Sequence, residues 1–71
     1  MISYKPLFKL LLERDISRKQ LKESVPLSGN VMAKLSKGEY VSMEVIERIC
    51  TYLDCHVEDV VEITTQKKDG I

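Results

Sequence analysis

Five basic side chains are crowded into residues 17–38, where Glu23 is the only acidic residue. Such a group can neutralise the phosphates of a nucleic acid. Residues 39–63 reverse the balance, with seven acidic residues against Arg48 alone, and the whole chain has a net charge of zero. This distribution predicts one face for an anion and another turned away from it, although two solvated surfaces of opposite sign would give the same pattern. The five basic residues are Arg18, Lys19, Lys22, Lys34 and Lys37.

The residue types needed for catalysis or metal binding are not grouped in this sequence. His56 is the single histidine, and no serine, aspartate or cysteine pattern around it is typical of a catalytic site. Cys50 and Cys55 are five residues apart, which is not a zinc-ligand spacing. We therefore predict two reduced thiols in a cytoplasmic protein that is not an enzyme. No metal, cofactor or small-molecule ligand is expected.

The length of 71 residues predicts one domain with a thin core, which buries roughly 60% of the surface of the unfolded chain. An apolar share of 44% is typical of a globular protein. We expect a folded domain over residues 1–63 and a flexible tail over the polar residues 64–71. The longest apolar run, Leu10 to Leu12, is far too short to span a membrane, and no signal peptide is expected.

Helix start and stop signals predict an all-α bundle of about five short helices, over residues 5–14, 18–24, 29–37, 43–54 and 58–61. Ser17 and Gln20 form a capping box, and Ser28 and Ser42 are candidate N-caps. Gly38 is suited to a left-handed C-cap. The helix over 43–54 is expected to bury one stripe that consists of Met43, Ile46, Ile49, Cys50 and Leu53.

The helices predicted over 18–24 and 29–37 are joined by a turn of about four residues, so they must cross steeply. Their shared apolar side chains are expected to hold the pair together while the second helix projects its first turn outward. This is the helix-turn-helix geometry that places a helix in the major groove of DNA. The shared side chains are Leu21, Val25, Leu27, Met32 and Leu35.

The stretch from Ile16 to Gly38 resembles the Cro/repressor-type, lambda-repressor-like helix-turn-helix regulators, in their short stand-alone branch. The resemblance continues through Val41 to Ile63 and covers most of the chain. It implies sequence-specific binding of double-stranded DNA and regulation of transcription in a bacterium or phage. It is carried by Ile16–Ser17, Leu21, Leu27–Ser28, Met32, Leu35, Lys37–Gly38 and the serine-capped helix that follows.

Three positions depart from the family pattern: Arg18 stands where the family usually has Gln, Lys22 where it favours Ala, and Pro26 where it carries Gly. Arg18 can still reach a phosphate. Either the Lys22 ammonium extends out to solvent, or the two helices lie slightly further apart. Many relatives also join an Arg in the first helix to a Glu late in the third. Leu11 and Ser36 occupy those positions, so both partners of the ion pair are absent and no charge is left unpaired.

The resemblance implies that Gly29, Asn30, Val31 and Lys34 read base edges. Asn30 suits adenine, Lys34 suits guanine and Val31 can touch a thymine methyl group. Gly29 can offer only its backbone N–H. The expected phosphate contacts are Arg18, Lys19, Lys37 and Tyr40, with Ser28 and Ser42 as lesser candidates. Several have simpler interpretations: Asn30 is also typical of a solvated helix surface, and Lys37 suits a helix C-terminus without DNA.

A homodimer on two half-sites about one helical turn apart is expected, because a monomer with so few cations would bind weakly. The interface is expected within Tyr52 to Ile63, and residues 60–65 could also extend and pair as a strand. The alternative function is an antitoxin-like or accessory protein-interaction module on the same scaffold, because a fold does not settle a function. Lys22, Pro26 and Gly29 keep this alternative open.

Overall fold

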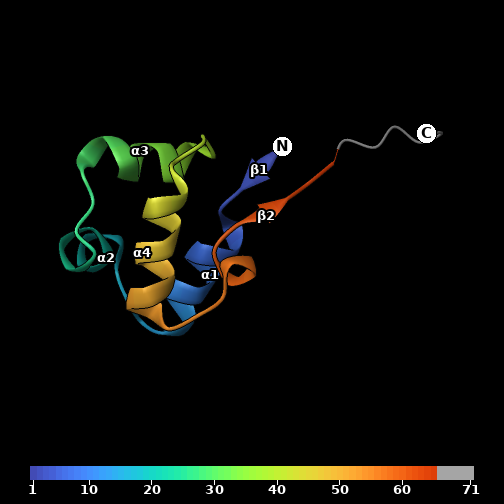
Figure 1. The fold of residues 1–71 in the computed structure, drawn as a ribbon. Coiled ribbons are helices and arrows are strands. Elements are labelled where there is room, and N and C mark those ends of the chain that lie inside the picture. Colours follow the sequence, from blue (N-terminus) through green and yellow to red (C-terminus); the bar gives the residue numbers. More distant parts are fainter. Residues whose placement is uncertain (66–71) are drawn as a thin grey trace.

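The computed structural model describes residues 1–65. Four α-helices confirm the all-α prediction, with one 3-10 turn (η1) in place of the fifth helix and a two-stranded ribbon that joins the chain ends (Figure 1). α3 lies across one end of α4 in this view, and α2 lies beside α4. The elements in chain order are β1 (Ile2–Ser3), α1 (Lys5–Glu13), α2 (Arg18–Ser24), α3 (Gly29–Lys37), α4 (Met43–Leu53), η1 (Val57–Asp59) and β2 (Glu62–Ile63).

The predicted caps start and end the helices of the helix-turn-helix. The Ser17 Oγ accepts the Gln20 N–H at 3.0 Å, and the Gln20 Oε1 accepts the Ser17 N–H at 2.9 Å, which completes the capping box. Ser28 and Ser42 cap α3 and α4 in the same way. Gly38 ends α3 with φ of +76°, a left-handed conformation that costs glycine little because it has no Cβ. Local sequence therefore fixes where these helices begin and end.

One apolar core lies between the four helices and η1. α4 buries Ile46, Ile49 and Leu53, as the predicted stripe requires. The prediction for Met43 is wrong, because this side chain is 71% exposed. A helical side chain packs over the turn that precedes it, and Met43 is the first residue of α4, so no such turn exists. The full core is Tyr4, Leu7, Leu11, Leu21, Leu27, Leu35, Ile46, Ile49, Leu53 and Val60.

The chain ends meet in an antiparallel ribbon. Ile2 pairs with Ile63 and Ser3 with Glu62. Met1 and Thr64 extend the pairing, because the Met1 ammonium donates to the Thr64 carbonyl and the Thr64 N–H donates to the Met1 carbonyl, each at 2.8 Å. The strand expected within residues 60–65 thus forms with the chain's own N-terminus. Of the tail expected over residues 64–71, residues 66–71 lie outside the described residues.

Candidate nucleic-acid interface

A backbone hydrogen bond and two buried leucines fix the turn between α2 and α3. The Lys22 carbonyl accepts the Leu27 N–H at 2.7 Å, which ties the end of α2 to the residue before the α3 cap. Leu21 and Leu27 are buried on the core side of this junction. The peptide between Val25 and Pro26 is cis. The turn therefore sets the position of α3 relative to α2 through backbone bonds as well as apolar packing.

α3 is fastened to the core by one fully buried side chain, Leu35, with Val31 and Met32 partly buried against it. Asn30 is exposed and Lys34 is half-buried. These two residues are four apart and so lie on the same side of the helix. The Val31 side chain is partly buried, so part of it packs against the core and part is exposed to solvent. Among the predicted base-reading residues, Asn30 and Lys34 thus present the most polar side-chain surface.

The predicted phosphate contacts lie around α3. Lys19, Lys37 and Tyr40 are exposed, and Tyr40 most plainly at 76%. The Ser28 Oγ accepts the Val31 N–H at 3.1 Å, and the Ser42 Oγ accepts the Val45 N–H at 3.2 Å. Each capping hydroxyl keeps its own O–H to donate elsewhere. Exposed donors therefore occur on α2, at both ends of α3 and in the loop beyond it.

Arg18 joins three helices. Its Nη1 donates to the Ser36 Oγ at 3.1 Å, and its guanidinium lies 4.2 Å from the centroid of the Phe8 ring. The contact with Phe8 has the geometry of a cation–π interaction. Arg18 and Ser36 depart from the family pattern at separate positions of the sequence, and the structure brings them together. Arg18 is still exposed, so it can hold α3 and offer further N–H donors at the surface.

Arg48 is a residue of this region that sequence analysis missed. Its Nη2 donates to the Pro26 carbonyl at 2.9 Å and to the Val25 carbonyl at 3.3 Å. Both carbonyls belong to the turn between α2 and α3, so an arginine on α4 clamps the turn. The contact spans more than 20 residues of sequence. Only the unusual position of one cation in the acidic segment 39–63 could have drawn attention to it.

Replacing Arg48 with alanine is expected to destabilise the fold by about 1 kcal/mol, because two turn carbonyls lose their donor at an exposed site. Thermal unfolding of Arg48→Ala and Arg48→Lys checks this. We expect Arg48→Lys to be intermediate, because an ammonium lacks the planar fork of guanidinium. Equal melting temperatures for Arg48→Ala and the wild-type chain would show that the clamp contributes nothing.

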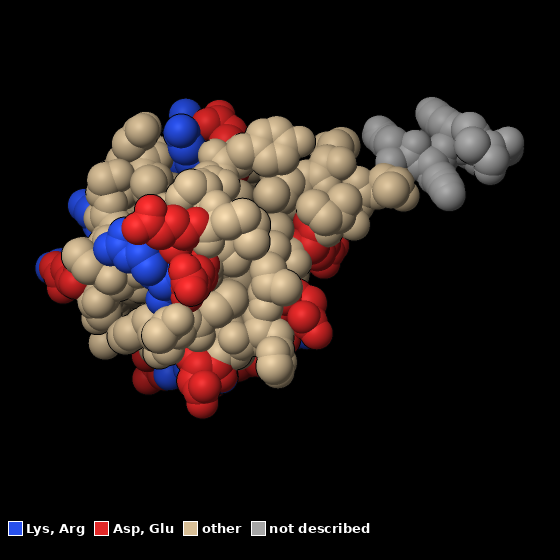
Figure 2. Space-filling view, in the orientation of Figure 1, with Lys and Arg blue, Asp and Glu red and all other residues tan. Residues whose placement is uncertain are grey.

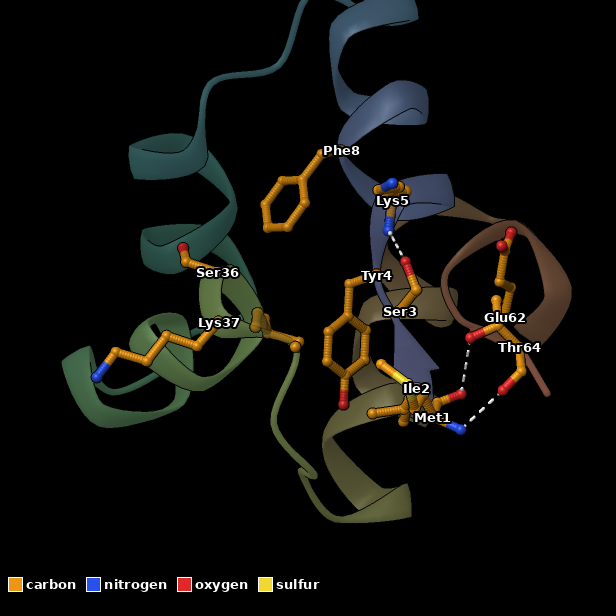
Figure 3. Close-up of a pocket in the computed structure, with 12 residues that line it drawn as sticks. Met1, Ile2, Ser3, Tyr4, Lys5, Phe8, Ser36, Lys37, Glu62 and Thr64 are labelled. Atoms are coloured by element: carbon orange, nitrogen blue, oxygen red, sulfur yellow. Dashed lines mark hydrogen bonds between the residues drawn. The ribbon is translucent and has the colours of Figure 1, made fainter. Parts of the chain in front are cut away.

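Tyr4 holds the loop after α3. Its side chain is buried, and its hydroxyl donates to the Glu39 carbonyl at 2.8 Å. Burial raises the pKa of the Tyr4 phenol, so the hydroxyl remains a donor at neutral pH. Figure 3 shows the open hollow beside Tyr4, between β1 and the end of α3, with the Lys37 side chain directed away from it. Tyr4 thus fixes the loop that carries Tyr40 without being part of the outer surface.

Basic and acidic side chains are unevenly distributed along the chain, and both kinds reach the surface. Figure 2 shows acidic side chains along the lower and right borders of the view, and others next to basic side chains at the upper border, at the left border and in the middle of this face. Basic side chains reach the surface at the upper and left borders, near α3 and α2. This agrees with the sequence, where residues 17–38 hold five basic side chains and residues 39–63 hold seven acidic ones. The excess of basic side chains thus lies in the helix-turn-helix segment, and this excess suits an anionic partner.

Cys50 and Cys55 lie together at the end of α4, where the Cys55 N–H donates to the Cys50 carbonyl at 3.1 Å. Both are free thiols. Within residues 1–65, no three or more His, Cys, Asp and Glu side chains gather as metal ligands. Over the same residues, no helix is long and apolar enough to cross a membrane.

Burial, and then the neighbouring Cys50 thiol, raise the pKa of Cys55 to about 11. A thiol whose folded-state pKa exceeds its unfolded value stabilises the fold below the unfolded pKa and loses this contribution as the pH rises through the folded pKa. We therefore expect stability to fall between about pH 9 and pH 11. Urea unfolding of the wild-type chain and Cys55→Ser across this range checks it. A loss of equal size in both proteins would exclude Cys55 as its source.

Comparison with known proteins agrees with this geometry. The family model of the Cro/C1-type HTH DNA-binding domain matches residues 7–66. The crystal structure of the transcriptional regulator VanUg has the same fold, with a TM-score of 0.84 and 44% sequence identity. That match covers 86% of this chain and 81% of VanUg. Among curated proteins no match is found.

Proposed function

Because the chain belongs to the family of Cro/C1-type helix-turn-helix DNA-binding domains, we propose that it binds duplex DNA at a preferred sequence and regulates transcription there. The observation that carries this proposal is the presentation of α3. The helix begins at a serine cap, is anchored through Leu35, and leaves Asn30 exposed and Lys34 half-exposed on one side. That arrangement suits a helix that enters the major groove with its first turns. The site of action is the cytoplasm, where bacterial or phage DNA is read.

The residue roles follow from chemistry and position. Asn30 can pair with adenine and Lys34 with guanine, while Val31 offers an apolar contact to thymine. Gly29 contributes at most its backbone N–H. Arg18, Lys19, Lys37 and Tyr40, with Ser28 and Ser42, are proposed to contact phosphates and set the register of the protein on DNA. No catalytic step is assigned to any residue.

A homodimer on two half-sites is part of the proposal, because one small basic surface gives weak and strongly salt-dependent binding. The segment from Tyr52 to Ile63 stays our prediction for the interface. The backbone of its last residues already pairs with β1, and its exposed apolar side chains are Tyr52, Val57 and Ile63, at 41%, 45% and 71%. Sedimentation equilibrium with and without DNA measures the state of assembly.

Selection of duplexes from a randomised pool at low salt tests the proposed function. We expect enrichment of one sequence with two related half-sites about 10 base pairs apart. A matched control is the same selection with Asn30→Ala/Lys34→Ala, which should enrich a less defined sequence. If the wild-type chain retains no duplex at low salt, the proposal is wrong and the protein-interaction module is favoured. The exposed Met43 and Tyr52 side chains would then be the first places to look for a protein partner.

A further inference from the structure

The Lys22 side chain reaches from the last turn of α2 to the first residue of α3. Its Nζ lies 4.0 Å from the position that a Cβ on Gly29 would occupy. Lys22 is exposed, as expected of a lysine whose stem crosses a helix junction. The Lys22 ammonium of α2 therefore lies beside Gly29, the residue of α3 that has no side chain.

The backbone fixes this juxtaposition. The Lys22 carbonyl accepts the Leu27 N–H at 2.7 Å, and the Ser28 cap sets where Gly29 begins α3. Residues 22 and 29 are thus held at a constant separation across the turn. Any larger side chain at residue 29 would extend into the space beside the Lys22 ammonium. A Cβ at residue 29 would be in ordinary van der Waals contact with that ammonium, so Lys22 occupies the surface next to the position that has no side chain.

No hydrogen bond of the Lys22 ammonium occurs within residues 1–65, so its three N–H donors face solvent. An interaction with the dipole of α2 would direct the ammonium toward the last carbonyls of that helix. The ammonium instead lies at the start of α3, whose helix dipole disfavours a cation there. A negatively charged or acceptor group of a partner would remove that disadvantage.

We propose that Lys22 contacts DNA in place of the side chain that Gly29 lacks, and that it donates to an acceptor oxygen or nitrogen facing residue 29. This inference rests on the proposed function. It adds a cation to the interface at the one predicted base-reading position without a side chain. The acceptor is a phosphate oxygen or the O6 and N7 edge of guanine, since an ammonium can donate to either.

Lys22→Met tests the proposal, because it removes the charge and keeps the length of the stem. Lys9→Met is the matched control: it removes the same charge from α1, where Lys9 lies beside Glu13, Glu58 and Asp59. At 0.15 M salt we expect Lys22→Met to bind the selected duplex about 5- to 10-fold more weakly. Lys9→Met should bind within about twofold of wild type, and both variants should keep the wild-type melting temperature within about 4 °C, since both sites are exposed.

Two further measurements identify the acceptor. An equal loss on all duplexes, with the salt slope smaller by about 0.9, indicates a phosphate. A loss confined to duplexes with one particular base pair indicates a guanine edge. Either outcome supports the proposal.

The double variant Lys22→Met/Gly29→Lys returns a cation to the same place from the other helix, and we expect it to recover most of the lost affinity. Equal binding by Lys22→Met and Lys9→Met would overturn the inference while DNA binding by the wild-type chain stands. Failure of the double variant to recover any affinity would equally count against Lys22 acting at the place of residue 29. If the wild-type chain itself binds no duplex, the inference falls together with the proposed function.

Discussion

Replacing Leu35 with alanine is expected to destabilise the protein by roughly 2–5 kcal/mol, the range for a leucine truncated in a packed core. Leu35 is 1% exposed and is the only fully buried side chain of α3. A chain of 71 residues has a total stability of only about 4–10 kcal/mol, so the change removes a large part of it. Urea unfolding followed by circular dichroism measures the loss. DNA binding should weaken in parallel, because α3 loses its main anchor.

Leu12→Ala provides the matched control for Leu35→Ala. Leu12 is 81% exposed on α1, so the same chemical change leaves no cavity. We expect its free energy of unfolding to stay within about 0.5 kcal/mol of wild type. If Leu35→Ala and Leu12→Ala had equal free energies of unfolding, Leu35 would not be the core residue that anchors α3.

Asn30→Ala and Lys34→Ala are expected to weaken binding to the selected duplex by roughly 1–3 kcal/mol each. Each truncation removes the donors or acceptors proposed to read one base, so sequence preference at that base should relax. Fluorescence anisotropy titrations on the selected duplex and on single base-pair variants measure both effects. Asn30 is exposed, and no hydrogen bond of its side chain occurs in the described part of the chain, so Asn30→Ala should unfold at the wild-type temperature.

Lys19→Ala distinguishes base reading from phosphate contact in the same titrations. Lys19 lies on the exposed surface of α2 and is proposed to touch only the DNA backbone. It should weaken all duplexes about equally and reduce the salt slope by about 1. Identical profiles for Lys19→Ala and Asn30→Ala would contradict the base-reading role of Asn30.

The limits of α2, α3 and α4 were predictable because their signals are local. Ser17, Ser28 and Ser42 each bond to a backbone N–H three residues ahead, and Gly38 adopts a conformation that other residues rarely reach. The core stripe of α4 followed from helical spacing: Ile46, Ile49 and Leu53 are buried and Cys50 is partly buried, whereas Met43 is exposed because no preceding turn exists to cover its side chain. Predictions that depend on a few neighbouring residues are therefore the ones the structure confirms.

The contacts that position α3 could not be predicted, because they join residues far apart in sequence. Arg18 meets Ser36 and Phe8, Arg48 reaches the turn before α3, and Tyr4 bonds to the Glu39 carbonyl. The sequence offers each of these long polar side chains several possible hydrogen-bond partners. The packing of the core decides which partner comes within reach. In place of the helix expected over residues 58–61 the chain forms the 3-10 turn η1, and the following β2 pairs with β1 from the opposite end of the chain.

The basic segment from residue 17 to residue 38 thus had its helices, its caps and its charge determined by sequence alone, because hydrogen bonding to the next three residues and net charge do not depend on the fold. The tertiary structure decided which of those charged side chains contact other residues of the protein and which face solvent. It directs Arg18 toward Ser36 and Phe8 and leaves Lys22 beside Gly29. The reason is that the crossing of α1, α2 and α3 sets the distances between side chains, and those distances come from the packing of Leu7, Leu21 and Leu35 in the core.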